Sequence, residues 1–411
     1  MKKVLSLLFV LLLFPFNHLV YANEVKTTSD IVLLYNLNDD EIIYELNSEK
    51  EVNIASLTKM MTALVAIENC DDLDEKVTIQ SSYFEGLEEY SMAGFDVGEQ
   101  ITVKELLYGV LLPSGAEACN AIAYHIGKDM NGFVQLMNQK ASELNLTHTQ
   151  FDNPIGIDSE KNYSSAKDLS TLLKNALSNP TFKEIFTTKK QYIASADITL
   201  ETTLIGYSKS YGINTSTILG SKTGYTSGAG YCLASIATFD DIDYLLIVLN
   251  ADTDKRYNAV LDSLKVYEYY SKNYGYHTVV PKSEIIHNIP IKWGMEKEYS
   301  ITTKEDIVEY IQNDFEQSKI KLNYNGVEEL NYKIKKGDLL GTVTVSYEDK
   351  VLGNFDVYLD EDIIYVDPYL LLILLVLLLI VGSLYAIRFY NIRKKRLRKR
   401  QLKRQQQLRR R

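Results

Sequence analysis

Ala55-Ser56-Leu57-Thr58-Lys59-Met60-Met61 is the stretch from which the rest of the chain is best interpreted. On an α-helix, residues three apart share a face, so the Ser56 hydroxyl and the Lys59 amine are expected within hydrogen-bond reach. A serine hydroxyl becomes an effective nucleophile when an adjacent base removes its proton. A lysine can be that base only when burial or a second cation lowers its pKa, and the apolar residues that follow predict such burial. The stretch therefore predicts a serine nucleophile and a lysine base on a buried helix that runs to about Glu68.

The Ser-x-x-Lys spacing occurs three times in the chain, so the spacing alone does not identify a site. The copy Ser164–Lys167 overlaps Ser165-Ala166-Lys167-Asp168, which is a capping box in front of a leucine-rich helix and has a structural role. The copy Ser318–Lys321 lies in a polar stretch that offers a lysine no apolar surroundings. Only the copy Ser56–Lys59 combines the spacing with apolar neighbours and with two further motifs downstream.

The first 22 residues have the pattern of a secretory signal peptide. Lys2 and Lys3 precede an apolar run from Val4 to Phe16, and Val20 and Ala22 stand at positions −3 and −1 of an expected cleavage site. We expect cleavage after Ala22, so residues 1–22 take no part in the mature fold.

Residues 369–387 form an apolar run without a charge and predict a transmembrane helix. At 1.5 Å per residue this run spans roughly 28 Å, close to the hydrocarbon thickness of a bilayer. Residues 388–411 contain 13 Lys or Arg and no acidic residue. The positive-inside rule therefore places this tail in the cytoplasm and the residues before the helix outside the cell.

The charge distribution separates a strongly acidic exported part from the basic tail. Of 44 Lys and Arg residues, 13 lie in the tail and 2 in the signal peptide, so 29 remain against all 54 Asp and Glu residues, a net charge of −25. Such a surface argues against binding acidic polymers, and we expect no nucleic-acid partner. The tail is expected to act as a stop-transfer anchor, and it could also bind anionic lipid.

Cysteine and histidine usage argues against several kinds of site. Cys70, Cys119 and Cys232 are too few for a disulfide framework, and their apolar surroundings predict buried free thiols. The five histidines show no metal-ligand spacing, and one of them belongs to the signal peptide. A zinc hydrolase and a Ser-His-Asp triad are therefore not expected, and the sequence implies no metal and no organic cofactor.

Hydrophobic periodicity predicts an α+β domain: a hairpin, a mainly helical block and an antiparallel meander closed by a long helix. A β-ribbon is also expected over residues 181–217. The other expected ranges are strands at 31–35, 41–46 and 76–79, helices ending near Pro113 and at 131–144 and 167–177, meander strands at 216–225, 231–239 and 244–250, and a closing helix at 256–273. Thr102-Val103-Lys104-Glu105 is a capping box for the helix that ends near Pro113.

Two further motifs follow the Ser56 helix. Ser114 and Glu117 of Leu111-Leu112-Pro113-Ser114-Gly115-Ala116-Glu117 have the spacing of a capping box for the next helix. A cap is compatible with a second role, because a helix that starts at a cleft can also present its hydroxyl to that cleft. Lys222-Thr223-Gly224 stands at the end of the first meander strand and is the only such triplet in the chain.

The order Ser-x-x-Lys, Ser-Gly and Lys-Thr-Gly resembles the serine penicillin-recognising enzymes. Within that group the chain looks most like the low-molecular-mass D-alanyl-D-alanine carboxypeptidases. The similarity covers roughly residues 28–275 and includes Asn153-Pro154-Ile155-Gly156 and Gly220-Ser221-Lys222-Thr223-Gly224-Tyr225-Thr226. It implies a β-lactamase/transpeptidase-like α+β domain, with an antiparallel sheet covered by helices on both faces and a helical subdomain.

The resemblance also implies catalytic roles. Ser56 would attack the carbonyl of the penultimate D-Ala and form an acyl-enzyme while Lys59 takes its proton. Ser114 would pass a proton towards the leaving amine. Lys222 would help to hold Lys59 neutral and, with Thr223, would bind the terminal carboxylate.

Two positions next to Thr223 complete the implied substrate-binding set. The backbone N–H groups of Tyr225 and Ser56 would form the oxyanion hole, each donor contributing roughly 3 kcal/mol of transition-state stabilisation. Gly224 would let the strand approach the substrate without an intervening side chain.

Three positions depart from the family pattern. The second motif is usually Ser-x-Asn, but residue 116 is Ala, which removes an amide expected to contact the substrate and Lys59. Asn120, one helical turn further, is a candidate substitute. The usual proline before Ala-Ser is Ile54, and the usual histidine of the Asn-Pro-His-Gly loop is Ile155. We therefore expect altered efficiency or substrate preference rather than loss of activity.

The expected domains include a second exported unit without a chemical motif. Alternation over 334–359 predicts a small β-sandwich, which the family often carries as a spacer or partner surface. The predicted limits are signal peptide 1–22, catalytic transpeptidase-like domain 23–278, β-rich C-terminal domain 279–366, transmembrane helix 369–387 and basic cytoplasmic tail 388–411.

The resemblance predicts a penicillin-sensitive serine D,D-carboxypeptidase of the cell envelope, acting on peptidoglycan stem pentapeptides that end in D-Ala-D-Ala. A β-lactamase is one alternative, but no Glu-x-x-Leu-Asn between Ser114 and Lys222 supplies a carboxylate for the deacylating water. A membrane-anchored penicillin-binding sensor with a weak site is another. Ala116 favours the sensor, whereas the intact Ser56, Lys59 and Lys222 disfavour it.

Overall fold

The computed structural model describes residues 25–408, so the predicted signal peptide, residues 1–22, lies outside the described residues. The chain divides into two compact units, Met1–Lys272 and Asn273–Arg411. Each unit has apolar clusters of its own. The domain limits at residues 278 and 366 remain predictions.

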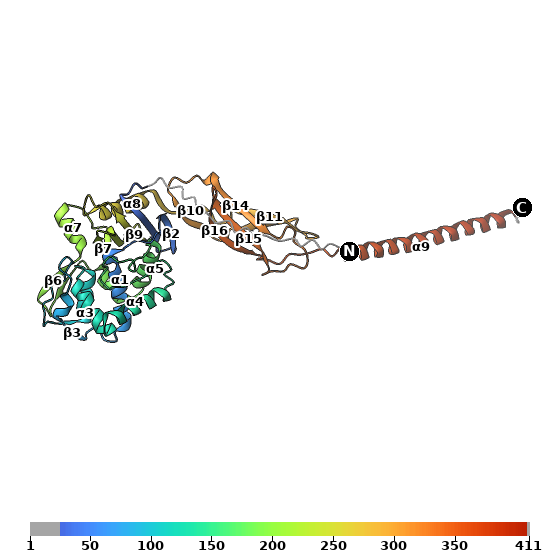
Figure 1. Ribbon diagram of the computed structural model, residues 1–411. Coiled ribbons are helices and arrows are strands. Elements are labelled where there is room, and N and C mark those ends of the chain that lie inside the picture. The colour runs from blue at the N-terminus through green and yellow to red at the C-terminus, as the bar shows by residue number, and fades with distance from the viewer. Residues whose placement is uncertain (1–24, 409–411) are drawn as a thin grey trace, which may run out of the picture. The chain divides into compact units, whose positions relative to one another are not determined.

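The first unit is organised around an antiparallel sheet with the strand order β2-β1-β9-β8-β7 (Figure 1). Its strands are β1 (Ser29–Asn36), β2 (Glu41–Leu46), β7 (Ile218–Thr226), β8 (Gly230–Phe239) and β9 (Ile242–Ala251). The predicted hairpin and the predicted meander are therefore confirmed. They join into one sheet because β1 pairs with β9, with Leu33 opposite Ile247.

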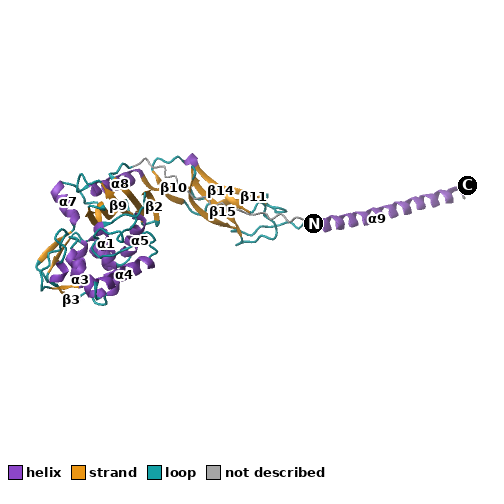
Figure 2. Cartoon of the chain, viewed as in Figure 1, coloured by secondary structure: helices purple, strands orange, loops and turns teal. Residues whose placement is uncertain are grey.

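Both faces of this sheet are buried. Ile31 and Leu33 of β1 belong to the main apolar core that they share with the helical region. On the opposite face lies α8 (Asn258–Asn273), whose Tyr267 ring contacts that of Tyr244 and whose Tyr267 hydroxyl lies 3.0 Å from that of Ser235. A strand covered on both sides needs a nearly continuous apolar run, which the inner strands β1, β8 and β9 supply, whereas the edge strand β2 is largely exposed. The predicted α+β arrangement with helices on both faces is confirmed (Figure 2).

The helical region between β2 and β7 supplies much of the candidate site. Its elements up to residue 177 are η1 (Ala55–Leu57), α1 (Thr58–Asn69), β3 (Lys76–Thr78), η2 (Ser81–Phe84), β4 (Gln100–Thr102), α2 (Val103–Leu111), α3 (Ala116–Gly127), α4 (Met130–Glu143) and α5 (Ala166–Leu177). The predicted capping box of α2 is confirmed, because Thr102 and Glu105 each accept a hydrogen bond from the other's backbone N–H. Ser165 caps α5 through the Asp168 N–H.

The prediction of a β-ribbon over residues 181–217 is wrong for most of that range. Only β5 (Lys190–Ile193) and β6 (Ile198–Glu201) pair there, between α6 (Pro180–Thr187) and α7 (Thr203–Tyr211). Asn179 accepts hydrogen bonds from the first N–H groups of α6, and Pro180 occupies a position where no N–H is needed. The buried side chains of α6 follow helical spacing.

The cysteine prediction holds for two of three residues. Cys119 and Cys232 are buried free thiols. Cys70 is only half-buried, because it lies at the C-terminal cap of α1, where the chain leaves the core. The prediction of burial is therefore wrong for Cys70.

The second unit is β-rich, as predicted. The structure pairs β10 (Tyr274–Val280) with β13 (Ile307–Gln312) and β11 (Ile285–Pro290) with β12 (Glu298–Thr302), and joins β14 (Ile320–Gly326), β15 (Leu339–Tyr347) and β16 (Lys350–Tyr358). Strand β15 contributes Leu340 to one apolar cluster and Val345 to the other. This strand therefore links the two clusters of the unit.

One helix, α9 (Pro368–Leu408), contains both the predicted transmembrane run and most of the basic tail. Within residues 25–408 it is the only helix long and apolar enough to cross a membrane, with a mean hydropathy of 3.1 over its best window. None of that window is buried against the protein. Exposed apolar surface of this length favours a bilayer as its environment, so α9 suggests membrane anchoring.

Candidate active site

The proposed nucleophile lies in a tight turn rather than on the helix itself. Ser56 is in the 3₁₀ turn η1, and α1 begins two residues later, so Lys59 lies in the first turn of that helix. The distance between Ser56 Oγ and Lys59 Nζ is 3.0 Å. The prediction that one α-helix carries both residues is therefore corrected, while the predicted juxtaposition of serine and lysine is present.

Two glycines hold this turn in an uncommon backbone conformation. Ala55 has φ +47°, a region that residues with a side chain rarely adopt. A Cβ added to Gly156 would lie 1.9 Å from the Ala55 carbonyl oxygen, and one added to Gly224 would lie 3.1 Å from the Ser56 nitrogen. Gly224 therefore has a role beyond the predicted one, because it lets β7 pack directly against the nucleophile turn.

Lys59 is buried without a carboxylate in its hydrogen-bond shell. Its Nζ lies 3.0 Å from Ser56 Oγ and 2.9 Å from the Ile155 carbonyl oxygen. Burial lowers the pKa of Lys59 below its ordinary value of 10.5, while Cys119 and Glu117 act in the opposite direction. A neutral amine beside a hydroxyl is the arrangement that a general base requires. Because the Ile155 contact uses its backbone, the change from the usual histidine does not remove it.

A second lysine faces a second serine. Lys222 Nζ lies 2.9 Å from Ser114 Oγ and 2.8 Å from the Thr223 carbonyl oxygen, and the Lys222 side chain is fully buried. Burial first and the neighbouring Lys59 second hold the pKa of Lys222 well below its ordinary value of 10.5. The site thus contains two serine–lysine pairs. Ser56, Lys59 and Ser114 come from the helical region, and Lys222 comes from strand β7 of the sheet.

The predicted capping role of Ser114 is wrong. Gly115 is the N-cap of α3 and no side chain caps it, while Ser114 has φ +69° and its hydroxyl accepts from Lys222. Glu117 instead accepts hydrogen bonds from the N–H groups of Ala93 and Gly94. The left-handed turn at Ser114 therefore directs its hydroxyl to the sheet, and Glu117 secures the preceding loop.

The proposed replacement of the missing amide by Asn120 does not occur. Ala116 is fully buried, and the Asn120 amide donates to the Tyr83 carbonyl oxygen at 2.9 Å. Asn120 lies on the part of α3 that faces η2, so its amide nitrogen is committed to that element, while its Oδ1 is buried without a hydrogen-bond partner within residues 25–408. Among the described residues, the side-chain hydrogen bonds of Lys59 and Lys222 go to Ser56, Ile155, Ser114 and Thr223, so no side-chain amide takes the place of the missing one.

The Lys-Thr-Gly strand is the outer strand of the sheet on its side. Strand β7 pairs with β8 only, so its other edge has no strand neighbour in this sheet. Thr223 is mostly buried, and its hydroxyl lies 2.6 Å from that of Thr203 in α7. Tyr225 is half exposed and stacks on Tyr231 with ring centroids 4.3 Å apart. An edge of this kind can receive an extended peptide by backbone hydrogen bonding.

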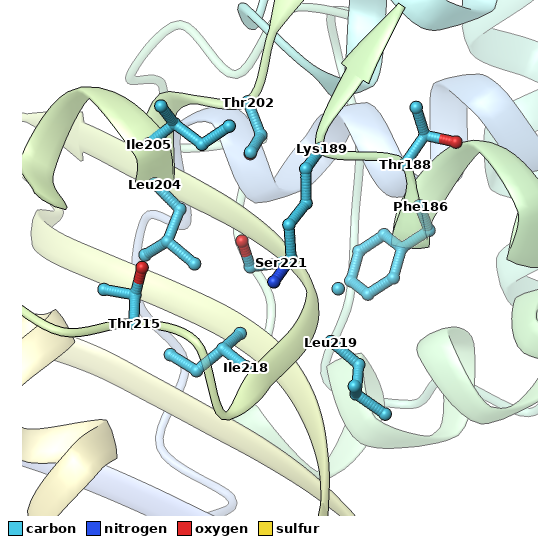
Figure 3. A pocket seen from close by; sticks show the side chains of 11 residues that line it. Phe186, Thr188, Lys189, Thr202, Leu204, Ile205, Thr215, Ile218, Leu219 and Ser221 are labelled. Atoms are coloured by element: carbon cyan, nitrogen blue, oxygen red, sulfur yellow. The ribbon is translucent and has the colours of Figure 1, made fainter. Parts of the chain in front are cut away.

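Figure 3 shows a small cavity beside the start of β7, with the Lys189 side chain reaching towards Ser221. Its volume is about 20 Å³, room for roughly one water molecule. Phe186 and Leu204 line it with apolar surface. The cavity is too small for a peptide, so it is not the site at which a substrate would bind.

The sequence motifs include neither Thr203, which contacts Thr223, nor Arg256, whose charge acts on Tyr231. Thr203 lies in the range for which the sequence predicts a β-ribbon, so the pattern indicates no helix start there. Arg256 is the only arginine before residue 388, and this single occurrence is the sequence feature that distinguishes it. Its charge acts on Tyr207 and Tyr231, whose pKa values burial raises and Arg256 lowers. No cluster of potential metal ligands occurs among residues 25–408.

The fold and the two serine–lysine pairs define a penicillin-binding, transpeptidase-type enzyme. Residues 19–253 match the family described as D-alanyl-D-alanine carboxypeptidase, and residues 274–364 match the penicillin-binding protein 5 C-terminal domain. The chain belongs to the D-alanyl-D-alanine carboxypeptidase family, and its activity is that of a serine D,D-carboxypeptidase.

Individual relatives agree with this assignment. The chain is 29% identical to D-alanyl-D-alanine carboxypeptidase DacF of Bacillus subtilis, over 88% of this chain and 95% of the relative. It is similar to the solved penicillin binding protein 5 from Haemophilus influenzae, with 25% identity and a TM-score of 0.61 over 82% of this chain and 98% of that one. It is also similar to the Streptomyces K15 DD-transpeptidase, with 30% identity and a TM-score of 0.54 over 59% and 97%. The relatives favour the carboxypeptidase over the sensor and the β-lactamase.

Proposed function

We propose that the chain removes the terminal D-Ala from peptidoglycan stem pentapeptides through an acyl-enzyme on Ser56. The observation that carries this proposal is the 3.0 Å approach of Ser56 Oγ to the buried Lys59 amine, with a second buried lysine, Lys222, nearby. Burial lowers the pKa of Lys59 and so favours the neutral form that can accept the serine proton.

Acylation uses Ser56, Lys59 and Ser114. Lys59 takes the Ser56 proton as Oγ attacks the carbonyl carbon of the penultimate D-Ala, and the backbone N–H groups of Ser56 and Tyr225 stabilise the oxyanion. Ser114, in contact with Lys222, gives its proton to the leaving nitrogen as the C–N bond breaks and D-Ala departs, and it takes over the proton held by Lys59, so Ser114 is restored and Lys59 is neutral again. Water then attacks the ester carbonyl and gives a proton to the neutral Lys59. Lys59 passes that proton to Ser56 Oγ as the ester C–O bond breaks, so the shortened peptide leaves and the Ser56 hydroxyl is restored.

Recognition of the terminal carboxylate is assigned chiefly to Thr223. Its hydroxyl lies on β7 next to the nucleophile turn and retains some exposure, whereas Lys222 is fully buried and bonded to Ser114. Lys222 therefore contributes mainly by holding Ser114. The absence of an amide at Ala116 is expected to change efficiency or preference.

The proposed location is the outer face of the cell membrane. The apolar part of α9 would span the bilayer, and the basic residues after it would keep the tail in the cytoplasm. The catalytic unit would then face the cell wall, where D-Ala-D-Ala stem peptides occur. β-Lactams are proposed as inhibitors that acylate the same Ser56.

The test is D-Ala release from a synthetic stem pentapeptide by the full chain in detergent. Wild type should release one D-Ala per peptide, and Ser56→Ala should release none. Lys59→Gln, which keeps most of the side-chain length but cannot act as a base, should lose at least about 10²-fold in kcat, in line with general-base contributions. A Ser56→Ala variant that still releases D-Ala would refute the proposal.

A further inference from the structure

We infer that Thr203, the first residue of α7, is a positioning residue that aims the Thr223 hydroxyl at the substrate carboxylate. The inference rests on the proposed carboxylate role of Thr223 and adds the residue that controls it. Thr203 has no counterpart among the motifs of the sequence and comes from a different element than Thr223.

Thr203 is fixed at both its backbone and its side chain. Its N–H donates to the Leu112 carbonyl oxygen at 3.1 Å, and its Oγ1 lies 2.6 Å from Thr223 Oγ1. Leu112 is two residues before Ser114 in the segment that turns left-handed at the second serine. Thr203 thus connects the Ser114 segment to the Lys-Thr-Gly strand.

The contacts form a closed circuit around one side of the site. Thr223 accepts from Lys222 through its carbonyl, Lys222 contacts Ser114, and the segment before Ser114 binds Thr203, which returns to Thr223. A circuit of this kind fixes several dihedral angles with one set of hydrogen bonds. The Thr223 side chain, whose β-branched χ1 has few rotamers, is therefore held in one of them.

The proton count makes Thr203 relevant to recognition rather than to packing alone. Each threonine hydroxyl has one proton to donate and can accept, whereas a carboxylate only accepts. When Thr223 donates to the substrate carboxylate, its oxygen remains available to accept the Thr203 proton. A carboxylate therefore selects the orientation in which Thr203 donates to Thr223, and Thr203 in turn disfavours Thr223 rotamers that point elsewhere.

A ligand without the carboxylate would not depend on this orientation. A C-terminal amide carries both a donor and an acceptor, so it can pair with the Thr223 hydroxyl in either direction. Loss of the Thr203 hydroxyl should consequently weaken a carboxylate-terminated peptide more than the corresponding amide. A purely structural role of Thr203 would weaken both ligands to the same extent.

The experiment compares Thr203→Val, Thr203→Ser and Thr202→Val in the full chain. Valine keeps the shape of threonine without its hydroxyl, serine restores the hydroxyl, and Thr202 is a neighbouring control whose side chain caps no backbone group of α7. The readouts are KM and kcat for D-Ala release from a stem pentapeptide, the inhibition constant of the same peptide as its C-terminal amide, and Tm.

Thr203→Val should raise KM about threefold to tenfold, the loss that one net hydrogen bond predicts, with kcat within about twofold of wild type. The amide inhibition constant should change less than twofold. Thr203→Ser should recover most of the wild-type KM, and Thr202→Val should match wild type in both KM and kcat.

An equal change for carboxylate and amide ligands, or an unchanged KM in Thr203→Val, would overturn the inference. A Thr223→Val variant distinguishes failure of the Thr203 inference from failure of the proposed function. If Thr223→Val raises KM but Thr203→Val does not, only the positioning role of Thr203 is refuted. If neither variant changes KM, the carboxylate role of Thr223 is refuted and the inference falls with it.

Discussion

Replacing Gly224 with alanine should damage the nucleophile turn although it removes no functional group. The added Cβ would lie 3.1 Å from the Ser56 nitrogen, the Ala55 Cβ and the Leu57 Cδ1. Two of these three atoms belong to the turn's backbone or to a Cβ fixed to it, so only Leu57 can move away cheaply. Relief of the contact therefore requires β7 and η1 to separate by a few tenths of an ångström.

The magnitude follows from packing and from geometry. Overpacking by one methyl group costs about 1–3 kcal/mol of folding free energy. A 1 Å misplacement of a reacting group can cost about 10²-fold in rate, so a smaller displacement of Ser56 is expected to lower kcat/KM by about tenfold. The decrease in kcat/KM should exceed the loss of folded protein that the change in Tm indicates, because the strain is located at Ser56, the proposed nucleophile.

The assay is kcat/KM for D-Ala release together with Tm, and Gly206→Ala provides the matched control. A Cβ on Gly206 meets nothing within 4 Å, and the residue lies within α7. Alanine there should be neutral or should stabilise the protein by up to about 1 kcal/mol through helix propensity. Wild-type kcat/KM in Gly224→Ala would refute the argument that close packing of β7 holds the Ser56 turn.

Three further predictions concern protonation, the loop and the anchor. The proposed base role of Lys59 requires its neutral form, so kcat/KM should rise with pH through a pKa below the ordinary 10.5 of lysine. A half-activity point at or above 10.5 in a pH–rate profile would contradict the burial argument. Glu117→Ala should lower the free energy of unfolding by about 2–4 kcal/mol, because it leaves the N–H groups of Ala93 and Gly94 without their acceptor. Chemical denaturation measures this free energy, and a decrease below about 0.5 kcal/mol would count against the role of Glu117. Truncation after Asp367 should move the protein from the membrane to the soluble fraction with D-Ala release retained, whereas persistent membrane association would show that α9 is not the main anchor.

The sheet and most helices could be predicted from the sequence because their signals are local. The strands around Leu33 and Ile247 are short apolar runs bounded by turn residues, and the α2 capping box consists of adjacent positions. The contact between Ser56 and Lys59 could also be predicted from local sequence, since the two residues are three positions apart. The position of Ser56 in a 3₁₀ turn was not predictable, because it depends on Gly156 and Gly224 from distant segments.

Ser114 illustrates where local pattern reasoning fails. Its spacing to Glu117 favoured a capping box, yet Ser114 pairs with Lys222, 108 residues further along the chain. Glu117 binds a loop instead of the helix start. Thr203 was missed for a related reason, because its partner Thr223 becomes apparent only once α7 packs beside β7.

The central claim is that Ser56 forms the acyl-enzyme. Intact mass of the full chain after exposure to benzylpenicillin tests it most directly, beside a Ser56→Ala control. The account predicts a stable increase equal to one penicillin molecule in wild type and none in the control. An adduct that persists in Ser56→Ala, or no adduct and no consumption of penicillin by wild type, would contradict the account, and rapid penicillin turnover would indicate a β-lactamase instead.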